Sequence, residues 1–184
     1  MLSEQKLEEA KYFLEGMKKT RIEPKSCYFN YSAFLSAWRS VFETLLYEGA
    51  IYYGIYDQYL KRYRKIPREL KSNEEKYLFI AAQIGNSQAV EFFGWMKAKL
   101  TEIRHTDLYQ ERNKAVHEGK IPEINYVPFQ IGLPDGHFSL IGFTESRRFQ
   151  KQITPYITNC EEEYCIAEKT VKEAVAKFHI NDKQ

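Results

Sequence analysis

Apolar residues recur at intervals of three and four along most of the chain, and this spacing limits the fold more than any other feature. It places apolar side chains on one face of an α-helix. The series that follows Ser32, a residue suited to an N-cap, comprises Phe34, Leu35, Trp38, Val41, Phe42, Leu45 and Leu46. A second series comprises Ile153, Ile157, Cys160, Tyr164, Ala167, Val171, Ala174 and Phe178. Helices with such faces depend on packing the faces together, which predicts an all-α bundle.

Segments with the same spacing predict the other helices, which cover residues 3–20, 69–84, 87–103 and 107–118. Pro24 is expected to separate the first helix from the one that begins at Ser32. That second helix is expected to continue, or to restart after a kink near Gly49 and Gly54, until Pro67. Pro155 is expected in the first turn of the last helix, where a proline is tolerated.

Between residues 124 and 143 the spacing changes to alternation. The alternating residues are Val127, Phe129 and Ile131, then Phe138, Leu140 and Gly142, on either side of the turn residues Pro134, Asp135 and Gly136. This pattern predicts a β-hairpin. The predicted architecture is therefore a single domain over residues 1–184, an up-and-down bundle of four to five long helices with a hairpin before the long C-terminal helix.

Composition excludes several classes of protein. The formal net charge is +2, so attraction to nucleic acid must come from a local basic patch. The cysteines Cys27, Cys160 and Cys165 lack the spacing of a zinc site or a disulfide framework. No apolar run is long enough to span a bilayer, and the N-terminal segment is acidic, unlike a signal peptide. We therefore expect a soluble, cytoplasmic protein with no membrane partner, no metal and no cofactor.

The clearest candidate for chemistry is Arg112-Asn113-x-x-x-His117, in a predicted helix that ends before Gly119. An arginine offers a permanently charged fork that matches a phosphate, and a histidine exchanges protons near neutral pH. Metal-independent RNA cleavage needs both functions at the scissile phosphate. Asn113 and His117 share one face of the helix, whereas Arg112 lies about 140° round the helix from His117 and must reach back with its side chain. The negative end of the helix dipole favours protonated His117.

The motif and its surroundings resemble the HEPN domains, a family of all-α bundles in which an arginine, a polar residue and a histidine lie late in one helix. The resemblance covers roughly residues 30–120, including 32–48, the segment Phe93-Gly94-Trp95 and 108–119. It implies a homodimer in which two motifs face one another in a shared cleft. Active members are metal-independent endoribonucleases that leave a 2′,3′-cyclic phosphate. Many are toxins, which implies an antitoxin partner, or act in defence against phage, and others are non-catalytic.

The resemblance assigns a role to each residue of the motif. Arg112 is expected to stabilise the charge that develops on the phosphate, His117 to act as acid and base, and Asn113 to fix the phosphate or the motif of the second copy. Two alternatives stay open. The bundle could be non-catalytic and bind a nucleotide or a protein partner through the same residues. The motif could also be a coincidence, with Arg112 paired to Glu111 or Glu118 on a solvated helix end.

A basic, tyrosine-rich segment is the best candidate for guiding RNA. Single-stranded RNA requires cations for its phosphates and rings for its bases, and Tyr59 and Tyr63 lie among such cations. We define the basic segment as Lys61, Arg62, Arg64 and Lys65. The spacing alone favours the alternative in which the tyrosines pack inward and the charges face water.

Four more residues are candidates to assist His117. A carboxylate from the second helix, either Glu43 or Glu48, could orient its imidazole. His105 and His137 could serve as second proton carriers, although single histidines at the ends of elements are usually incidental. The sequence does not separate these roles from those of ordinary surface residues.

Overall fold

The computed structural model describes residues 1–118 and 141–180, and for 24, 111, 114–118 and 141–149 it describes the backbone alone. Within these ranges the chain forms helices and no strand. The elements are α1 (Leu2–Lys19), α2 (Pro24–Tyr52), α3 (Ile55–Arg62), the 3-10 turn η1 (Tyr63–Lys65), α4 (Asn73–Gln83), α5 (Ser87–Arg104), α6 (Asp107–Glu118) and α7 (Ile141–Phe178).

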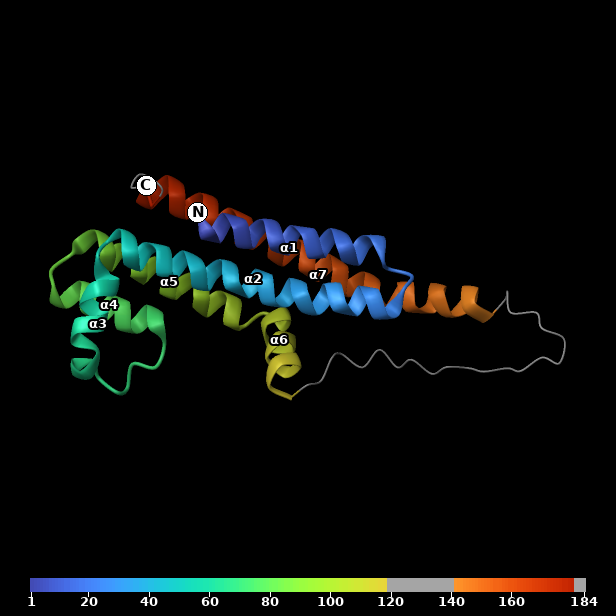
Figure 1. The fold of residues 1–184 in the computed structure, drawn as a ribbon, viewed down its shortest axis with the longest axis horizontal. Helices are drawn as coiled ribbons and strands as arrows, with labels where there is room; N and C mark the ends of the chain where they lie inside the picture. Colours follow the sequence, from blue (N-terminus) through green and yellow to red (C-terminus); the bar gives the residue numbers. More distant parts are fainter. Residues whose placement is uncertain (119–140, 181–184) are drawn as a thin grey trace.

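The four long helices α1, α2, α5 and α7 run in alternating directions along a common axis (Figure 1). The shorter helices α3 and α4 lie at one end of this bundle, and α6 leaves it at a steep angle (Figure 1). Helix α2 packs against α1, α3, α5, α6 and α7. The prediction of an all-α, up-and-down bundle is confirmed.

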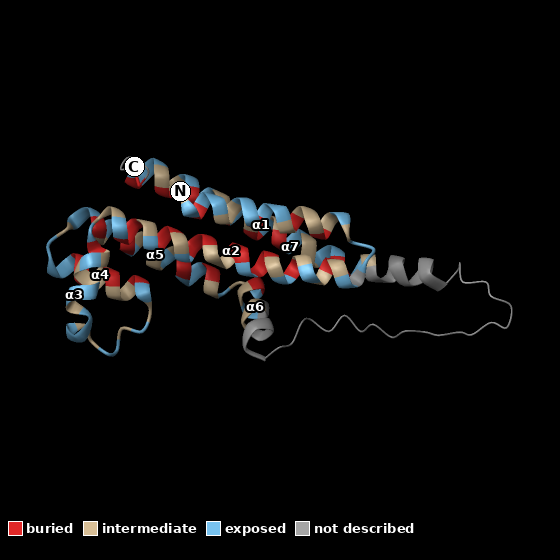
Figure 2. Cartoon of the chain, in the orientation of Figure 1, coloured by how far each residue is buried: buried red, intermediate tan, exposed pale blue. Residues whose placement is uncertain are grey.

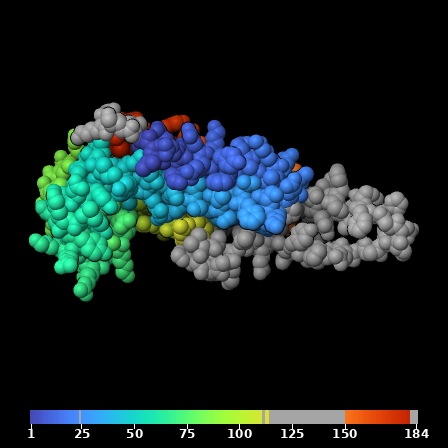
Figure 3. Space-filling view, in the orientation of Figure 1, coloured from blue at the N-terminus to red at the C-terminus, as the bar shows by residue number. Residues whose placement is uncertain are grey.

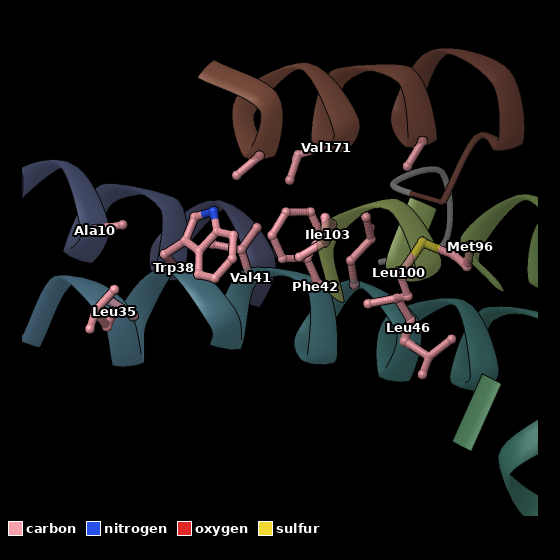
Figure 4. Packing of buried hydrophobic residues seen from close by; sticks show 14 of the residues in the cluster. Ala10, Leu35, Trp38, Val41, Phe42, Leu46, Met96, Leu100, Ile103 and Val171 are labelled. Carbon is pink, nitrogen blue, oxygen red and sulfur yellow. The ribbon is translucent and has the colours of Figure 1, made fainter. Parts of the chain in front are cut away.

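The apolar face of α2 forms the centre of the core. Trp38 and Phe42 are fully buried and meet edge to face, with their ring centroids 5.7 Å apart. The Trp38 indole Nε1 also donates a hydrogen bond of 3.2 Å to the carbonyl of Glu163 on α7. Figure 2 shows that buried residues follow the inward faces of the long helices, and Figure 4 shows Val171 and Met96 approaching the α2 face from two neighbouring helices. Burial of this face therefore joins three elements far apart in sequence.

Two predictions about prolines are wrong. Helix α2 begins at Pro24, eight residues before Ser32, because a proline at the first helical position lacks only an N–H that would have no partner there. Pro155 lies inside α7, fourteen residues after Ile141, and not in a first turn. A proline at this place leaves the carbonyl of Lys151 without its usual helical donor.

The two glycines near the end of α2 act differently. Gly54 has φ +67 and separates α2 from α3, which confirms the restart after a kink. Gly49 remains helical and lies against the ring of Phe92 on α5. It permits the close approach of the two helices, because a Cβ at this position would overlap the ring.

The predicted β-hairpin falls mostly outside the described residues. Residues 124–140 are not among them, so the turn at Pro134 stays a prediction. Residues 141–143 are described and belong to the first turn of α7. The prediction that the second strand of the hairpin includes Gly142 is therefore wrong. Three residues are too few for their pattern to separate a helix from a strand, and here a long amphipathic helical segment follows them.

Of the three cysteines, Cys27 and Cys160 are buried and Cys165 is exposed. Cys27 is fully buried between α1 and α2, and burial raises the pKa of its thiol to about 11. A thiol with a raised pKa is a poor nucleophile, so Cys27 acts as a small core residue. Across the described helices, none combines the length and the apolar character needed to cross a bilayer.

We expect opposite effects from alanine at two helical glycines. Gly49→Ala should lower the free energy of unfolding by about 1–3 kcal/mol, because its methyl group meets Phe92 in a packed interior. Gly94→Ala in α5 has open space around the added methyl and should raise it by about 0.5–1 kcal/mol through helix propensity. Urea unfolding followed by circular dichroism measures both variants. Equal effects of the two substitutions would contradict the proposed contact between α2 and α5.

Candidate functional site

The predicted site helix is present with the predicted bounds, Asp107–Glu118. Its start is fixed by local and tertiary contacts. The Thr106 hydroxyl accepts a hydrogen bond from the Tyr109 amide (3.3 Å), in the manner of an N-cap, and Asp107 lies in the first turn. Leu108 is buried in the core. Helix α6 is therefore anchored at its start and projects the motif outward from the bundle (Figure 1).

Arg112 and Asn113 are joined to one another. The Arg112 Nη1 donates a hydrogen bond of 3.2 Å to Asn113 Oδ1, and both side chains are half-buried. The Arg112 Nε is buried and has no hydrogen-bond partner within the described part of the chain. The bond draws the guanidinium toward Asn113, which shares a helix face with the position of His117.

His117 lies in α6 one turn beyond Asn113. Its side chain is outside the described side chains, as are those of Glu111 and Glu118. The convergence of His117 with Arg112, and the alternative pairing of Arg112 with either glutamate, both remain predictions. His137 also lies outside the described residues, whereas His105 is exposed at the end of α5.

A polar hollow that the sequence reading missed lies between α2, α5 and the start of α4. We call it the Arg39 hollow. Its volume is about 410 Å³, and its lining residues are Arg39, Glu43, Leu46, Lys71, Ser72, Asn73, Glu74, Leu100 and Arg104. These residues come from three separate parts of the chain, so no local motif could have indicated the site.

Arg39 connects this hollow to α6. Its Nε pairs with Glu43 Oε1 at 3.0 Å, and its Cζ lies 5.2 Å from the centroid of the Tyr109 ring. The Arg39 Nη1 is buried and has no hydrogen-bond partner among the residues described. Tyr109 stands one turn before Arg112 and Asn113, so the hollow adjoins the motif. In the space-filling view, the surface near the α5–α6 junction (yellow) lies beneath α2 (Figure 3).

A second ion pair forms another wall of the Arg39 hollow. Arg104 Nη2 contacts Glu74 Oε1, and the Glu74 side chain is only 3% exposed. Burial acts to lower the pKa of Arg104, but the hydrogen bond and the charge of Glu74 outweigh it, so the pKa is raised. The guanidinium of Arg104 is therefore a permanent cation at the hollow.

The basic segment lies at the other end of the bundle, on the last turn of α3 and on η1. Lys61, Arg64 and Lys65 are exposed, and Arg62 is half-buried. Within the described part of the chain, none of these four cations forms a salt bridge. They are available to solvent, as a phosphate-binding role would require.

The two tyrosines beside the basic segment meet edge to face, with their ring centroids 5.5 Å apart, but they differ in burial. Tyr59 packs inward, with its ring centroid 5.3 Å from that of the buried Tyr77, whereas Tyr63 is 59% exposed. Tyr63 lines a hollow of about 530 Å³, which we call the Tyr63 hollow. The remaining lining residues are Arg64, Ile66, Pro67, Arg68, Leu70 and Lys76. The inward-packing alternative is therefore confirmed for Tyr59 and wrong for Tyr63.

Each of the two candidate carboxylates, Glu43 and Glu48, has a partner elsewhere in the bundle. Glu48 binds the start of α1, where its Oε2 accepts a hydrogen bond of 2.6 Å from the Ser3 hydroxyl and its Oε1 accepts from the Leu2 and Ser3 amides. Glu43 pairs with Arg39. A carboxylate at a helix start is stabilised by the helix dipole and by unpaired amides, which accounts for the position of Glu48.

Among the side chains that the structure describes within residues 1–113 and 150–180, which do not include that of Glu111, no group of three or more histidine, cysteine or acidic side chains could hold a metal ion. Comparison of this chain with protein-family models, with curated proteins and with solved structures finds no match. The resemblance to HEPN domains therefore rests on the motif and its helical setting.

Glu163 of α7 lies beside Thr106, the residue that precedes α6. Its side chain is 8% exposed and its Oε2 is buried with no hydrogen-bond partner in the described part of the chain. Burial raises the pKa of this carboxyl group, and a hydrogen bond with Thr106 opposes the increase. The folded state therefore holds this proton to a higher pH than the unfolded state does. As a result, the free energy of unfolding falls as the pH rises from the ordinary pKa of a glutamate to the raised pKa of Glu163.

We therefore expect Glu163→Gln to unfold at a higher temperature than the original protein near neutral pH, because the amide carries no charge to bury. The difference should shrink as the pH falls toward about 4.3, the ordinary pKa of a glutamate, and should be absent below it. Thermal unfolding over a pH series measures it. Glu102→Gln changes an exposed glutamate on α5 and should have no such pH-dependent effect. A stabilisation by Glu163→Gln that is the same at every pH would contradict the assigned cause.

Proposed function

We propose that this protein is a metal-independent endoribonuclease of the HEPN type that cuts single-stranded RNA. The observation that carries the proposal is the Arg112–Asn113 pair, with a guanidinium drawn to the helix face of His117 and a buried Nε that lacks a partner among the described residues. A half-buried guanidinium with an N–H to donate is suited to a phosphate, and it binds more strongly there than in open water.

In the proposed reaction the 2′-oxygen attacks the neighbouring phosphorus and the bond from phosphorus to the 5′-oxygen breaks. The products are a 2′,3′-cyclic phosphate and a 5′-hydroxyl. One imidazole takes the proton of the 2′-hydroxyl, and another supplies a proton to the leaving 5′-oxygen. His117 of each copy in a homodimer provides the two imidazoles, and Arg112 stabilises the charge on the phosphoryl oxygens. A role as a toxin or in phage defence, in the cytoplasm and with an antitoxin partner, is what the family resemblance implies.

The first test is RNA cleavage in the presence of EDTA. The original protein should cut unstructured RNA and leave a cyclic phosphate, because no metal takes part in the proposed step. His117→Ala should lower the rate by at least about a hundredfold, the range of general acid–base catalysis. His179→Ala is the matched control, since it removes an exposed imidazole that follows the end of α7 and should leave the rate unchanged. Full activity of His117→Ala would contradict the proposal.

The proposed cleft also requires two copies of the chain. Light scattering across a dilution series should show a dimer at micromolar concentration. A monomer that still cuts RNA would remove the composite cleft from the mechanism, because one copy supplies only one His117.

A non-catalytic, nucleotide-binding bundle is the second candidate. The Arg39 hollow and the Tyr63 hollow favour it, since both have volumes usual for small-molecule sites. This function predicts no cleavage. A nucleoside monophosphate at a hundred times its dissociation constant should stabilise the fold by about 2.7 kcal/mol. Arg39→Gln, which alters the lining of the Arg39 hollow, should abolish that stabilisation, as measured by thermal unfolding with and without the nucleotide.

A further inference from the structure

We infer that the Arg39 hollow is a subsite that binds a backbone phosphate of RNA beside the Arg112 motif. The inference rests on the proposed function for the nature of its ligand. The site itself is separate, because none of its lining residues belongs to the motif. Three observations carry it: the state of Arg39, the balance of charge in the hollow and the position of the hollow between the motif and the Tyr63 hollow.

Arg39 is fixed on two sides and has a donor that is not used. Glu43 holds its Nε at 3.0 Å, the Tyr109 ring faces its Cζ at 5.2 Å, and its Nη1 is buried with no hydrogen-bond partner among the described residues. Leaving a charged, buried donor unpaired is unfavourable. A guanidinium already held in place needs little reordering to bind an oxyanion. Arg39 therefore presents an ordered cation at the wall of the hollow.

The charges of the hollow fit one monoanion. Each of its carboxylates is paired with an arginine, Glu43 with Arg39 and Glu74 with Arg104. The remaining cation, Lys71, is exposed and forms no salt bridge within the described part of the chain. One positive charge is therefore in excess. A phosphodiester carries one negative charge, so it fits this balance better than a dianionic phosphate monoester.

Two other cationic features neighbour the hollow. On one side, Arg39 contacts Tyr109 of α6, and Arg112 follows Tyr109 by one turn of that helix. On its other side, Lys71 follows Leu70, which lines the Tyr63 hollow. Cations thus continue on both sides of the Arg39 hollow. This continuity favours a phosphate within a polymer, with further phosphates bound on either side, over a free mononucleotide.

The test measures binding without cleavage, using a fluorescent oligouridylate with 2′-O-methyl groups, in EDTA. The methyl group blocks the proposed nucleophile, so affinity is read independently of catalysis. Arg39→Gln should weaken binding about tenfold, the loss of one charge-assisted hydrogen bond. Lys71→Gln should reduce the slope of log affinity against log salt by about 0.7, the value for one phosphate contact on a single strand. Lys71 is exposed, so this second variant keeps the test decisive if Arg39→Gln does not fold.

Two controls remove the same charges elsewhere. Lys11→Gln on α1 and Arg21→Gln in the α1–α2 connection replace exposed cations and should leave both affinity and salt slope unchanged. Inorganic phosphate and uridine monophosphate serve as competitors. Either competitor displacing the oligonucleotide at an equal concentration would overturn a subsite for backbone phosphate in favour of a mononucleotide site.

The outcomes separate this inference from the proposed nuclease. If the original protein cuts no RNA but Arg39→Gln and Lys71→Gln weaken oligonucleotide binding as expected, the nuclease is contradicted and the subsite is supported. If RNA is cut but both variants bind the oligonucleotide as the original protein does, the subsite is overturned and the nuclease stands.

Discussion

Helix α2 makes the rest of the structure possible, because it is the element against which α1, α3, α5, α6 and α7 all pack. Its apolar face buries Trp38 and Phe42, which gain most of their stabilisation from removal of ring surface from water. The hydrogen bond from the Trp38 indole to the Glu163 carbonyl satisfies a polar group that would otherwise be unpaired in the core. It also sets the position of α7 along α2.

The candidate site depends on the same helix. Arg39 follows Trp38 in sequence and is directed by the helical rotation away from the centre of the core, toward Tyr109 of α6. The residue that fills the core and the residue that contacts the site helix are thus neighbours on one rigid element. A site held by a packed helix keeps its charged groups in place before any ligand arrives. Binding then costs less conformational entropy, which increases the affinity.

Local signals in the sequence predicted some elements well. Asn86 accepts a hydrogen bond from the Ala89 amide and begins α5 as expected, and α6 has its predicted bounds. Each of these depends on a few neighbouring residues. Pro24 was misread because a proline can either end one helix or begin the next. Pro155 was misread because the residues before it in α7 lack the regular apolar spacing of the later turns.

The candidate site was predictable only in part. The Arg112-Asn113-x-x-x-His117 motif lies on a single helix, so spacing alone could find it. The Arg39 hollow brings together residues 39, 71–74 and 104, and their proximity arises from the packing of α2, α4 and α5. Likewise, only tertiary structure distinguishes Tyr59, which contacts Tyr77, from the exposed Tyr63 one turn later. Pairing across long sequence separations carries no local pattern.

The bond between Glu48 and the start of α1 has a consequence for cooperativity. The amides of Leu2 and Ser3 obtain their acceptor from a residue more than forty positions later in the chain, near the far end of α2. The opening turn of α1 is therefore held by α2 as well as by Glu4, whose carboxylate pairs with the Met1 nitrogen at 3.0 Å. The two helices form one folding unit, in which loosening either end exposes the backbone of both.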